Sequence, residues 1–155
     1  MDITPVDLAV ACSKALLSEQ KLSPDQIDQV ILGNVVPSTT DTMYGGRHLA
    51  LKLGCPIEVA GIVINRLCGS GIEAILEAAR LIKLGEASCV LAAGTENMSM
   101  VPHLTYGARF GTKYGSLKSV DMLLDALTDA YCQTPMGITA ENLAKKYSLT
   151  RQECD

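Results

Sequence analysis

The stretch from Glu58 to Leu84 decides the fold of this chain, and it reads EVAGIVINRLCGSGIEAILEAARLIKL. Its first part, up to Leu67, is a β-rich apolar run of the kind typical of a buried strand. Gly69-Ser70-Gly71 then favours a turn. From Ile72 onward the apolar residues recur at the spacing of an amphipathic helix, which Gly85 ends. The stretch therefore predicts a strand, a tight turn and a helix in succession.

The same alternation continues outward from this unit in both directions. Gln29 to Val36 and Ser88 to Ala93 are short apolar runs, which predict two further buried strands. Val6 to Leu17 and Tyr44 to Leu53 carry helical spacing, and Gly54 closes the second of them. Strands that read as continuous apolar runs and alternate with helices are typical of an α/β fold with a mostly parallel sheet.

The composition and the hydrophobic pattern of the sequence change after Gly94. Residues 98–118 are rich in Gly, Ser, Thr and Tyr and have no sustained period. Only short helical patterns follow, over Val120 to Ala130 and over Thr139 to Lys146. We therefore expect an α/β core over residues 1–97 and an irregular domain over residues 98–155.

The composition bounds the class of protein. The chain has 155 residues, of which 48% are hydrophobic, and a formal net charge of −4. A mildly acidic chain with scattered Lys and Arg argues against a nucleic-acid partner. No apolar stretch approaches the roughly 20 residues that span a bilayer, so we expect no membrane segment. The acidic start, Met1 to Pro5, lacks a targeting pattern, which favours the cytoplasm; the alternative is the mitochondrial matrix, with the targeting segment absent.

Six cysteines and two histidines carry the most versatile chemistry of the chain. No two cysteines stand at C-x-x-C spacing, and His48 and His103 complete no zinc pattern, so we expect no metal site. A disulfide framework is not expected in a chain with this much apolar core. Most of the thiols should therefore be reduced and inert.

Cys68 differs from the other cysteines because it stands between a predicted strand and a predicted helix. A helix N-terminus has unsatisfied N–H groups and a partial positive charge, which favour thiolate over thiol. The neighbouring glycines allow a sharp turn like the nucleophile elbow of hydrolases, and the N–H of Cys68 could help to hold an oxyanion. A second interpretation stays open, in which Cys68 is a small buried core residue.

The other cysteines fit less reactive roles. Cys12 shares an apolar helical face with Leu8 and Leu16, and Cys89 falls in a predicted strand, so we expect both in the core. The remaining three lie in loops or at element ends without a glycine turn, and we expect them to be incidental: Cys55, Cys132 and Cys154.

Three motifs in order along the chain carry a resemblance to the thiolase family, and the resemblance covers essentially the whole chain. Asn65 to Gly71, NRLCGSG, resembles the nucleophile segment of thiolases. Ala93 to Ser99, AGTENMS, resembles a segment that follows it in these enzymes. Met136 to Asn142, MGITAEN, with Arg151 to Asp155, RQECD, resembles their loop-domain signature. Arg109 to Lys113, RFGTK, is similar to the 3-ketoacyl-CoA thiolases of mitochondrial type.

The resemblance implies a partial thiolase-like fold. Residues 1–97 would form the three-layer α/β/α N-terminal half without its first strand, and residues 98–155 would begin the loop domain that covers coenzyme A. In the family's sheet, the second strand along the chain lies between the third and the fourth. The family's second half, with its Gly-His-Pro, Asn-Glu and Cys-x-Gly-Gly-Gly segments, has no counterpart in this sequence.

The resemblance also implies an activity, which is acyl transfer between thioesters. Cys68 would take the acyl group from a 3-ketoacyl-CoA, release acetyl-CoA and pass the acyl group to free CoA, or run the reverse condensation. Met136, with Gly137 beside it, would lie in the loop over the bound thioester. These features imply a thiolase of fatty acid metabolism that forms a homo-oligomer, a dimer or tetramer, and needs no cofactor because coenzyme A is its substrate.

The missing segments affect how far the activity extends. The family's second half supplies the acid–base groups, so we expect the 155-residue chain to be incomplete for turnover. Two alternatives stay open: a non-catalytic thiolase-fold remnant that acts as an interaction module, and a ketoacyl-synthase relative. The second shares the fold but has a different sequence around its nucleophile.

Overall fold

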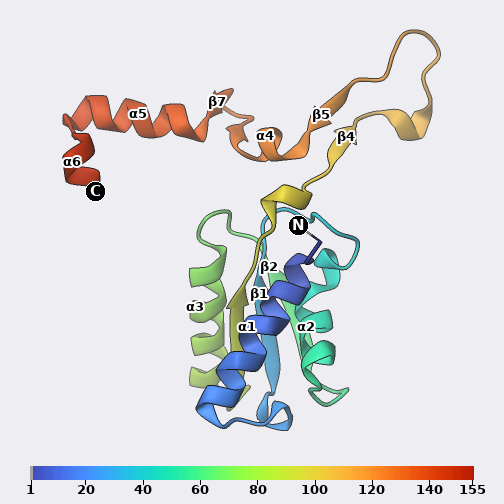
Figure 1. Ribbon diagram of the computed structural model, residues 1–155, viewed down its shortest axis with the longest axis vertical. Coiled ribbons are helices and arrows are strands. Elements are labelled where there is room, and N and C mark those ends of the chain that lie inside the picture. Colours follow the sequence, from blue (N-terminus) through green and yellow to red (C-terminus); the bar gives the residue numbers. More distant parts are fainter. Residues whose placement is uncertain (1) are drawn as a thin grey trace. The chain divides into compact units, whose positions relative to one another are not determined.

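The computed structural model describes residues 2–155 and divides into two compact units, Met1–Val101 and Pro102–Asp155 (Figure 1). The first unit contains the predicted α/β core. The second consists of short elements linked by turns.

The first unit is built on a sheet of three parallel strands, β1 (Gln29–Gly33), β2 (Ala60–Ile64) and β3 (Val90–Gly94). The strand order is β2-β1-β3, so the strand that comes first in the chain lies in the middle. This is the order that the resemblance implies, and the predicted α/β class is confirmed. Each strand is shorter than predicted; β2 stops at Ile64, because the chain leaves the sheet there to form the turn before the next helix.

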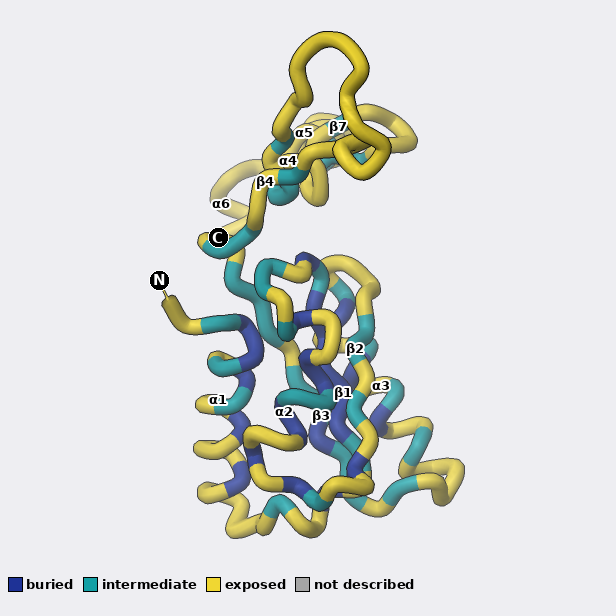
Figure 2. Tube along the Cα trace, turned by 90° about the vertical axis from the view of Figure 1, so that its right-hand side faces the viewer, coloured by how far each residue is buried: buried dark blue, intermediate teal, exposed yellow. Residues whose placement is uncertain are grey.

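Helices cover both faces of this sheet and complete three layers. The helices α1 (Pro5–Gln20) and α2 (Gly45–Leu53) lie on one face, and α3 (Ser70–Lys83) lies on the other (Figure 1). Figure 2 shows the most deeply buried chain in β1, between the two helical layers. The side chains of Val30, Ile31 and Leu32 are fully buried there.

The packed face of α1 is not the predicted one. Val6, Ala9, Ser13 and Leu17 are buried, whereas Cys12 is exposed. The expectation that Cys12 belongs to the core is therefore wrong. Small side chains at Ala9 and Ser13 let the helix axis come close to its neighbours, and a row of larger side chains on the same side would hold it away. The other apolar stripe of α1, Leu8 and Leu16, remains partly in contact with solvent, at 39% and 44% exposed.

The helix α3, on the opposite face of the sheet, also packs through its smaller side chains. It packs against Ile31 of β1 through Ala74 and Ala78. The stripe of large apolar side chains that predicts this helix turns away from the sheet: Ile72, Ile75, Leu76 and Ile82 are 67%, 61%, 44% and 48% exposed.

The helix α2 sits unusually close to the edge strand β2. A Cβ atom added at Gly46 would lie 2.2 Å from the carbonyl oxygen of Ile62, and one added at Gly61 would lie 2.4 Å from the backbone nitrogen of Arg47. The Arg47 guanidinium also donates hydrogen bonds to the backbone carbonyls of Ile57, at 2.7 Å, and of Val59. Only residues without a side chain permit this contact between backbones.

The second unit contains two small antiparallel ladders and three helices. The strand β4 (His103–Thr105) pairs with β5 (Ser119–Asp121), and β6 (Thr128–Asp129) pairs with β7 (Thr134–Pro135). None of residues 102–155 is buried. The helices are α4 (Met122–Ala126), α5 (Met136–Tyr147) and α6 (Arg151–Cys154).

The helical pattern predicted over Val120 to Ala130 is therefore only partly correct, because β5 and β6 occupy its two ends. Among residues 2–155, no helix is both long and apolar enough to cross a membrane. Residues 2–155 also contain four single turns of 3₁₀ helix: η1 (Pro24–Gln26), η2 (Thr42–Tyr44), η3 (Met98–Met100) and η4 (Ala108–Phe110).

Candidate active site

Cys68 lies in the short turn between β2 and α3, at the carboxyl end of the sheet. Gly69 is the N-cap of α3 and Ser70 is its first residue, so Cys68 immediately precedes the cap. Its side chain is exposed. The alternative in which Cys68 is a buried core residue is therefore excluded, and the thiol lies beside the positive end of the α3 dipole.

The turn is closed by two backbone hydrogen bonds and contains one strained residue. The N–H of Gly69 donates to the carbonyl of Arg66 at 3.1 Å, and the N–H of Ser70 donates to the carbonyl of Leu67 at 2.9 Å. Leu67 has φ of 49°, in the left-handed region that a side chain with a Cβ disfavours by about 1–2 kcal/mol. In this turn, the strained residue is the one before the cysteine, and surrounding contacts must hold it there.

Two polar side chains supply those contacts. The buried hydroxyl of Ser70 accepts from the N–H of Arg66 at 2.8 Å and donates to the carbonyl of Leu67 at 2.6 Å. The side chain of Asn65 accepts from the N–H of Leu67 at 3.0 Å and donates to the carbonyl of Val35 at 3.0 Å. Both backbone polar groups of Leu67 are thus bonded to side chains at the two ends of the turn.

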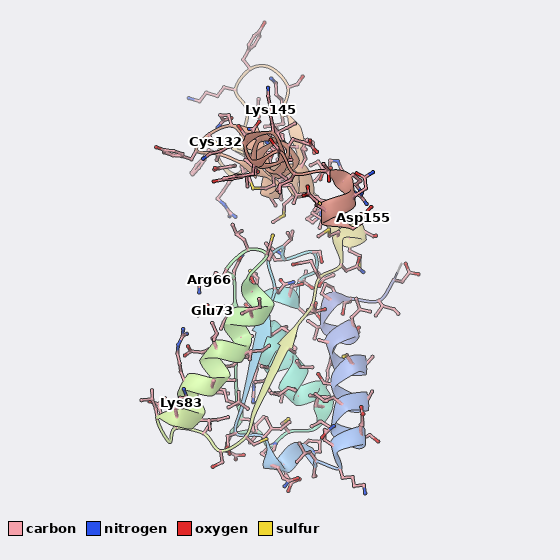
Figure 3. All side chains as sticks on the ribbon, turned by 90° about the vertical axis from the view of Figure 1, so that its left-hand side faces the viewer. Arg66, Glu73, Lys83, Cys132, Lys145 and Asp155 are labelled. Atoms are coloured by element: carbon pink, nitrogen blue, oxygen red, sulfur yellow. The ribbon has the colours of Figure 1, made fainter. Side chains whose placement is uncertain are left out.

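An ion-pair network runs from this turn along the surface of α3 (Figure 3). Arg66 pairs with Glu73, whose other carboxylate oxygen accepts from Arg80 at 2.9 Å. Hydrogen bonds from Arg80 and then from Arg66 lower the pKa of Glu73 below its ordinary value. The two arginines are 67% and 53% exposed, so solvent screens these pairs and they stabilise the turn only weakly.

The ends of β1 and β3 are joined beside this turn by a half-buried polar cluster. The Glu96 carboxylate accepts from the Asn34 side-chain amide at 2.9 Å and from the N–H groups of Val35 and Val36 at 2.9 and 3.1 Å. The Asn34 amide also donates to the carbonyl of Thr95 at 2.9 Å. Glu96 therefore fixes the loop that follows β1.

Gly33 allows α3 to start against this edge. A Cβ atom there would lie 2.8 Å from the carbonyl group of Ser70, so any side chain at position 33 would push the first turn of α3 away. The turn that carries Cys68 is positioned by contacts from β1, β2 and α3 together.

Asn65, Ser70 and Glu96 were not among the site residues expected from the sequence. Asn65 and Ser70 flank the cysteine, and Glu96 follows a predicted strand, where a lone carboxylate is more often structural. The signal that could have found them is topological: the carboxyl ends of neighbouring parallel strands meet at one edge of the sheet, where sites form.

Met136 and Gly137 belong to the second unit, whereas Cys68 belongs to the first. They are the first two residues of α5, and Pro135 is the N-cap. Met136 is 42% exposed, and nothing lies within 4 Å of a Cβ atom added at Gly137. Their role in binding substrate stays a prediction.

The remaining cysteines lack this combination of exposure, turn and helix start. Cys55 is buried, and burial raises the pKa of its thiol. Cys89 precedes β3 and is only half-buried, which corrects its expected place in the strand core. Within the described part of the chain, no group of three or more His, Cys, Asp and Glu side chains could hold a metal ion. Cys132 and Cys154 are exposed.

Comparison with known proteins identifies a family that matches this chain. The model of the thiolase N-terminal domain matches residues 1–155. Human mitochondrial 3-ketoacyl-CoA thiolase is 47% identical over 155 residues, which is 99% of this chain and 39% of that protein. An acetyl-CoA acetyltransferase of Pseudomonas aeruginosa is 43% identical, over 96% of this chain and 38% of its own.

Solved structures agree with the sequence matches. The crystal structure of human mitochondrial 3-ketoacyl-CoA thiolase in complex with CoA superposes with a TM-score of 0.94 at 47% identity, over 99% of this chain and 39% of that one. The Bacillus anthracis acetyl-CoA acetyltransferase gives a TM-score of 0.89 at 37% identity, over 97% of this chain and 38% of its own. The chain thus spans about two fifths of the length of these relatives.

Proposed function

This chain belongs to the thiolase family, and from that premise we propose that it carries the nucleophile of an acyl-transfer site, with Cys68 as the acyl acceptor. The observation that supports the proposal is the place of Cys68 in the fold. It is an exposed thiol on a constrained turn immediately before the N-cap of α3. The N-terminus of a helix is a position that favours reactive cysteines, because thiolate is the nucleophilic form.

In the degradative direction, the Cys68 thiolate attacks the ketone carbon C3 of a 3-ketoacyl-CoA, and the C2–C3 bond breaks. The electron pair of that bond, with the proton that the thiol gave up, completes the methyl group of the departing acetyl-CoA. The acyl group stays on Cys68 as a thioester. Free CoA then attacks the acyl carbon, and its thiol proton passes to the Cys68 sulfur as that bond breaks. Condensation of two acetyl-CoA molecules is the same sequence in reverse.

The proposed substrates are acyl-CoA and CoA. One relative of solved structure is described in complex with CoA, which supports this substrate class. Met136 and Gly137 would contribute to holding the thioester, and the proposed reaction uses no cofactor beyond coenzyme A itself. We further propose a role in fatty acid metabolism, because several relatives are named 3-ketoacyl-CoA thiolases.

The same relatives are named mitochondrial, which supports the matrix over the cytoplasm as the location. Subcellular fractionation followed by immunodetection of this chain separates the two: recovery with cytosolic markers alone would contradict the matrix. We also propose a homo-oligomer, because β2 is an open sheet edge and α3 exposes a row of large apolar side chains.

The experiment that tests the function is acylation of the 155-residue chain. Incubation with acetyl-CoA or acetoacetyl-CoA should place one acyl group on Cys68, detected by peptide mass spectrometry. Cys68→Ser should abolish that adduct, whereas Cys12→Ser, which changes another exposed thiol, should leave it intact. An unmodified Cys68, or acylation spread evenly over the exposed thiols, would favour the interaction-module alternative.

Steady-state turnover by the same chain is not expected. Both thiolysis and condensation need a positioned base, which typically contributes 10²–10⁴-fold to the rate. The sequence contains neither the Gly-His-Pro nor the Cys-x-Gly-Gly-Gly segment to which the resemblance assigns that work. Repeated release of acetyl-CoA from acetoacetyl-CoA, lost in Cys68→Ser, would show that a base lies elsewhere in these residues.

A further inference from the structure

We propose that Glu96 and Asn65 are positioning residues for Cys68, acting through a chain of hydrogen bonds that crosses the carboxyl ends of all three strands. The inference rests on the proposed function of Cys68. The hydrogen bonds that the two side chains form in the described residues go to backbone groups and to Asn34. Glu96 follows β3, and Asn65 follows β2.

The first step of the chain joins β3 to the loop after β1. Glu96 uses both carboxylate oxygens, one accepting from the N–H of Val35 and the other from the N–H of Val36 and the amide of Asn34. An ionised carboxylate only accepts hydrogen bonds, so it suits three converging donors. A glutamine of the same shape would turn an NH₂ group toward at least one of them, and that bond would be lost.

The second step joins that loop to the turn before α3. The carbonyl of Val35 accepts from the Asn65 amide at 3.0 Å, and the Asn65 carbonyl oxygen accepts from the N–H of Leu67 at 3.0 Å. The peptide unit between Val35 and Val36 thus accepts a bond from Asn65 at its carbonyl and donates one to Glu96 from its N–H. A peptide unit fixed at both of its polar groups cannot rotate without breaking one of these bonds.

The third step is the strained residue itself. Leu67 holds φ at 49° directly before Cys68, and a residue with a side chain relaxes from this conformation when its bonds are removed. Relaxation would rotate the peptide between Leu67 and Cys68 and move both the thiol and its N–H relative to the start of α3. Misplacement of a reacting group by about 1 Å costs up to about 10²-fold in rate.

The chain offers a matched control at the opposite end of the same strands. The Asp28 carboxylate accepts from the N–H groups of Ser88 and Cys89 at 2.7 and 2.9 Å, and so joins the amino ends of β1 and β3. Asp28→Asn therefore removes the charge of a carboxylate that joins the same pair of strands, at the opposite end from the turn that carries Cys68.

The experiment compares Glu96→Gln, Asn65→Ala, the double variant and Asp28→Asn in the 155-residue chain. Two rates are measured for Cys68: acylation by acetyl-CoA and alkylation by iodoacetamide across a range of pH, with exposed Cys12 as the internal reference. Each single variant at Glu96 or Asn65 should slow both rates by roughly 10- to 100-fold relative to Cys12.

The double variant should be no slower than Asn65→Ala alone, because both residues act along one path. Asp28→Asn should leave both Cys68 rates unchanged relative to Cys12, even if this variant lowers the free energy of unfolding. Multiplying effects in the double variant, or slowing by Asp28→Asn in proportion to lost stability, would overturn the proposal. If Glu96→Gln does not fold, the Cys68 rates of Asn65→Ala still test the proposal, because Asn65 is exposed and its replacement costs little stability. Failure of wild-type acylation counts against the proposed function alone, because alkylation tests positioning without it.

Discussion

At the scale of single residues, accessibility does not distinguish Cys68, because Cys12, Cys132 and Cys154 are exposed as well. Its position relative to a helix does distinguish it. Among the cysteines, only Cys68 combines exposure with the start of a long helix, and a thiol reacts through its thiolate.

With limiting iodoacetamide near neutral pH, we therefore expect Cys68 to be labelled first. Buried Cys55, whose pKa is raised by burial, should stay unlabelled until the protein unfolds. Peptide mass spectrometry of partly labelled protein measures the order. Labelling of Cys12 or Cys132 ahead of Cys68 would contradict the assignment of the nucleophile.

Asp28 gives the stability of the fold a dependence on pH. Hydrogen bonds from the N–H groups of Cys89 and then Ser88 lower its pKa below the ordinary value of 3.8. A carboxyl group whose pKa is lower in the folded state stabilises the fold above 3.8, and this contribution is lost as the pH falls through the folded value.

Asp28→Asn should therefore lower the free energy of unfolding near neutral pH and change it little in strong acid, where Asp28 is protonated in both states. Urea denaturation of the two proteins at several pH values measures the difference. A gap that stays constant through the acid range would mean that the Asp28 charge has no part in it.

At the scale of elements, the contact between α2 and β2 depends on the absence of side chains. Gly46→Ala would place a Cβ atom 2.2 Å from the backbone oxygen of Ile62, and backbone cannot swing aside as a side chain can. We expect it to destabilise the fold by about 1–3 kcal/mol or more.

The control for this prediction is Gly71→Ala, in the first turn of α3, where nothing lies within 4 Å of the added Cβ atom. That variant should be neutral, or stabilised by up to about 1 kcal/mol, because alanine favours helix. Urea denaturation measures both. Equal losses in the two variants would show that the close approach of α2 to β2 is not what makes Gly46 necessary.

The outward apolar stripe of α3 is the surface through which the proposed homo-oligomer would form. Ile72 and Ile75 are 67% and 61% exposed, so a charge at either position would cost little within the chain itself. Ile75→Lys should therefore reduce the mass measured by light scattering at tens of micromolar without lowering the free energy of unfolding of the monomer. A wild-type chain that is already monomeric under these conditions would contradict the proposed oligomer.

At the scale of the whole molecule, the two units differ in how they are stabilised. The first has a buried core around β1, whereas no residue from 102 to 155 is buried. Backbone amides in the second unit should therefore exchange with deuterium much faster than those of β1, because local opening there exposes little apolar surface. Hydrogen exchange followed by mass spectrometry measures the difference. Equal protection in α5 and β1 would mean that residues 102–155 are held by contacts beyond their own.

The elements of the first unit, and the position of Cys68 in the turn between a strand and a helix, could be predicted from the sequence. The hydrophobic period distinguishes strand from helix within a few residues, and Cys68 follows from its position between Ile64 and Ser70. The family motifs supplied the order of the strands. These signals are local, so a single stretch of chain contains them.

Tertiary structure alone decided which faces are buried and what holds the turn. Both α1 and α3 have two apolar stripes, and the stripe with the smaller side chains, such as Ala74, packs because it allows the closer approach to the sheet. Glu96 and Val35 bond to each other although they lie 61 residues apart. Such a pair is invisible to local spacing, because only the parallel sheet brings the ends of β1 and β3 together.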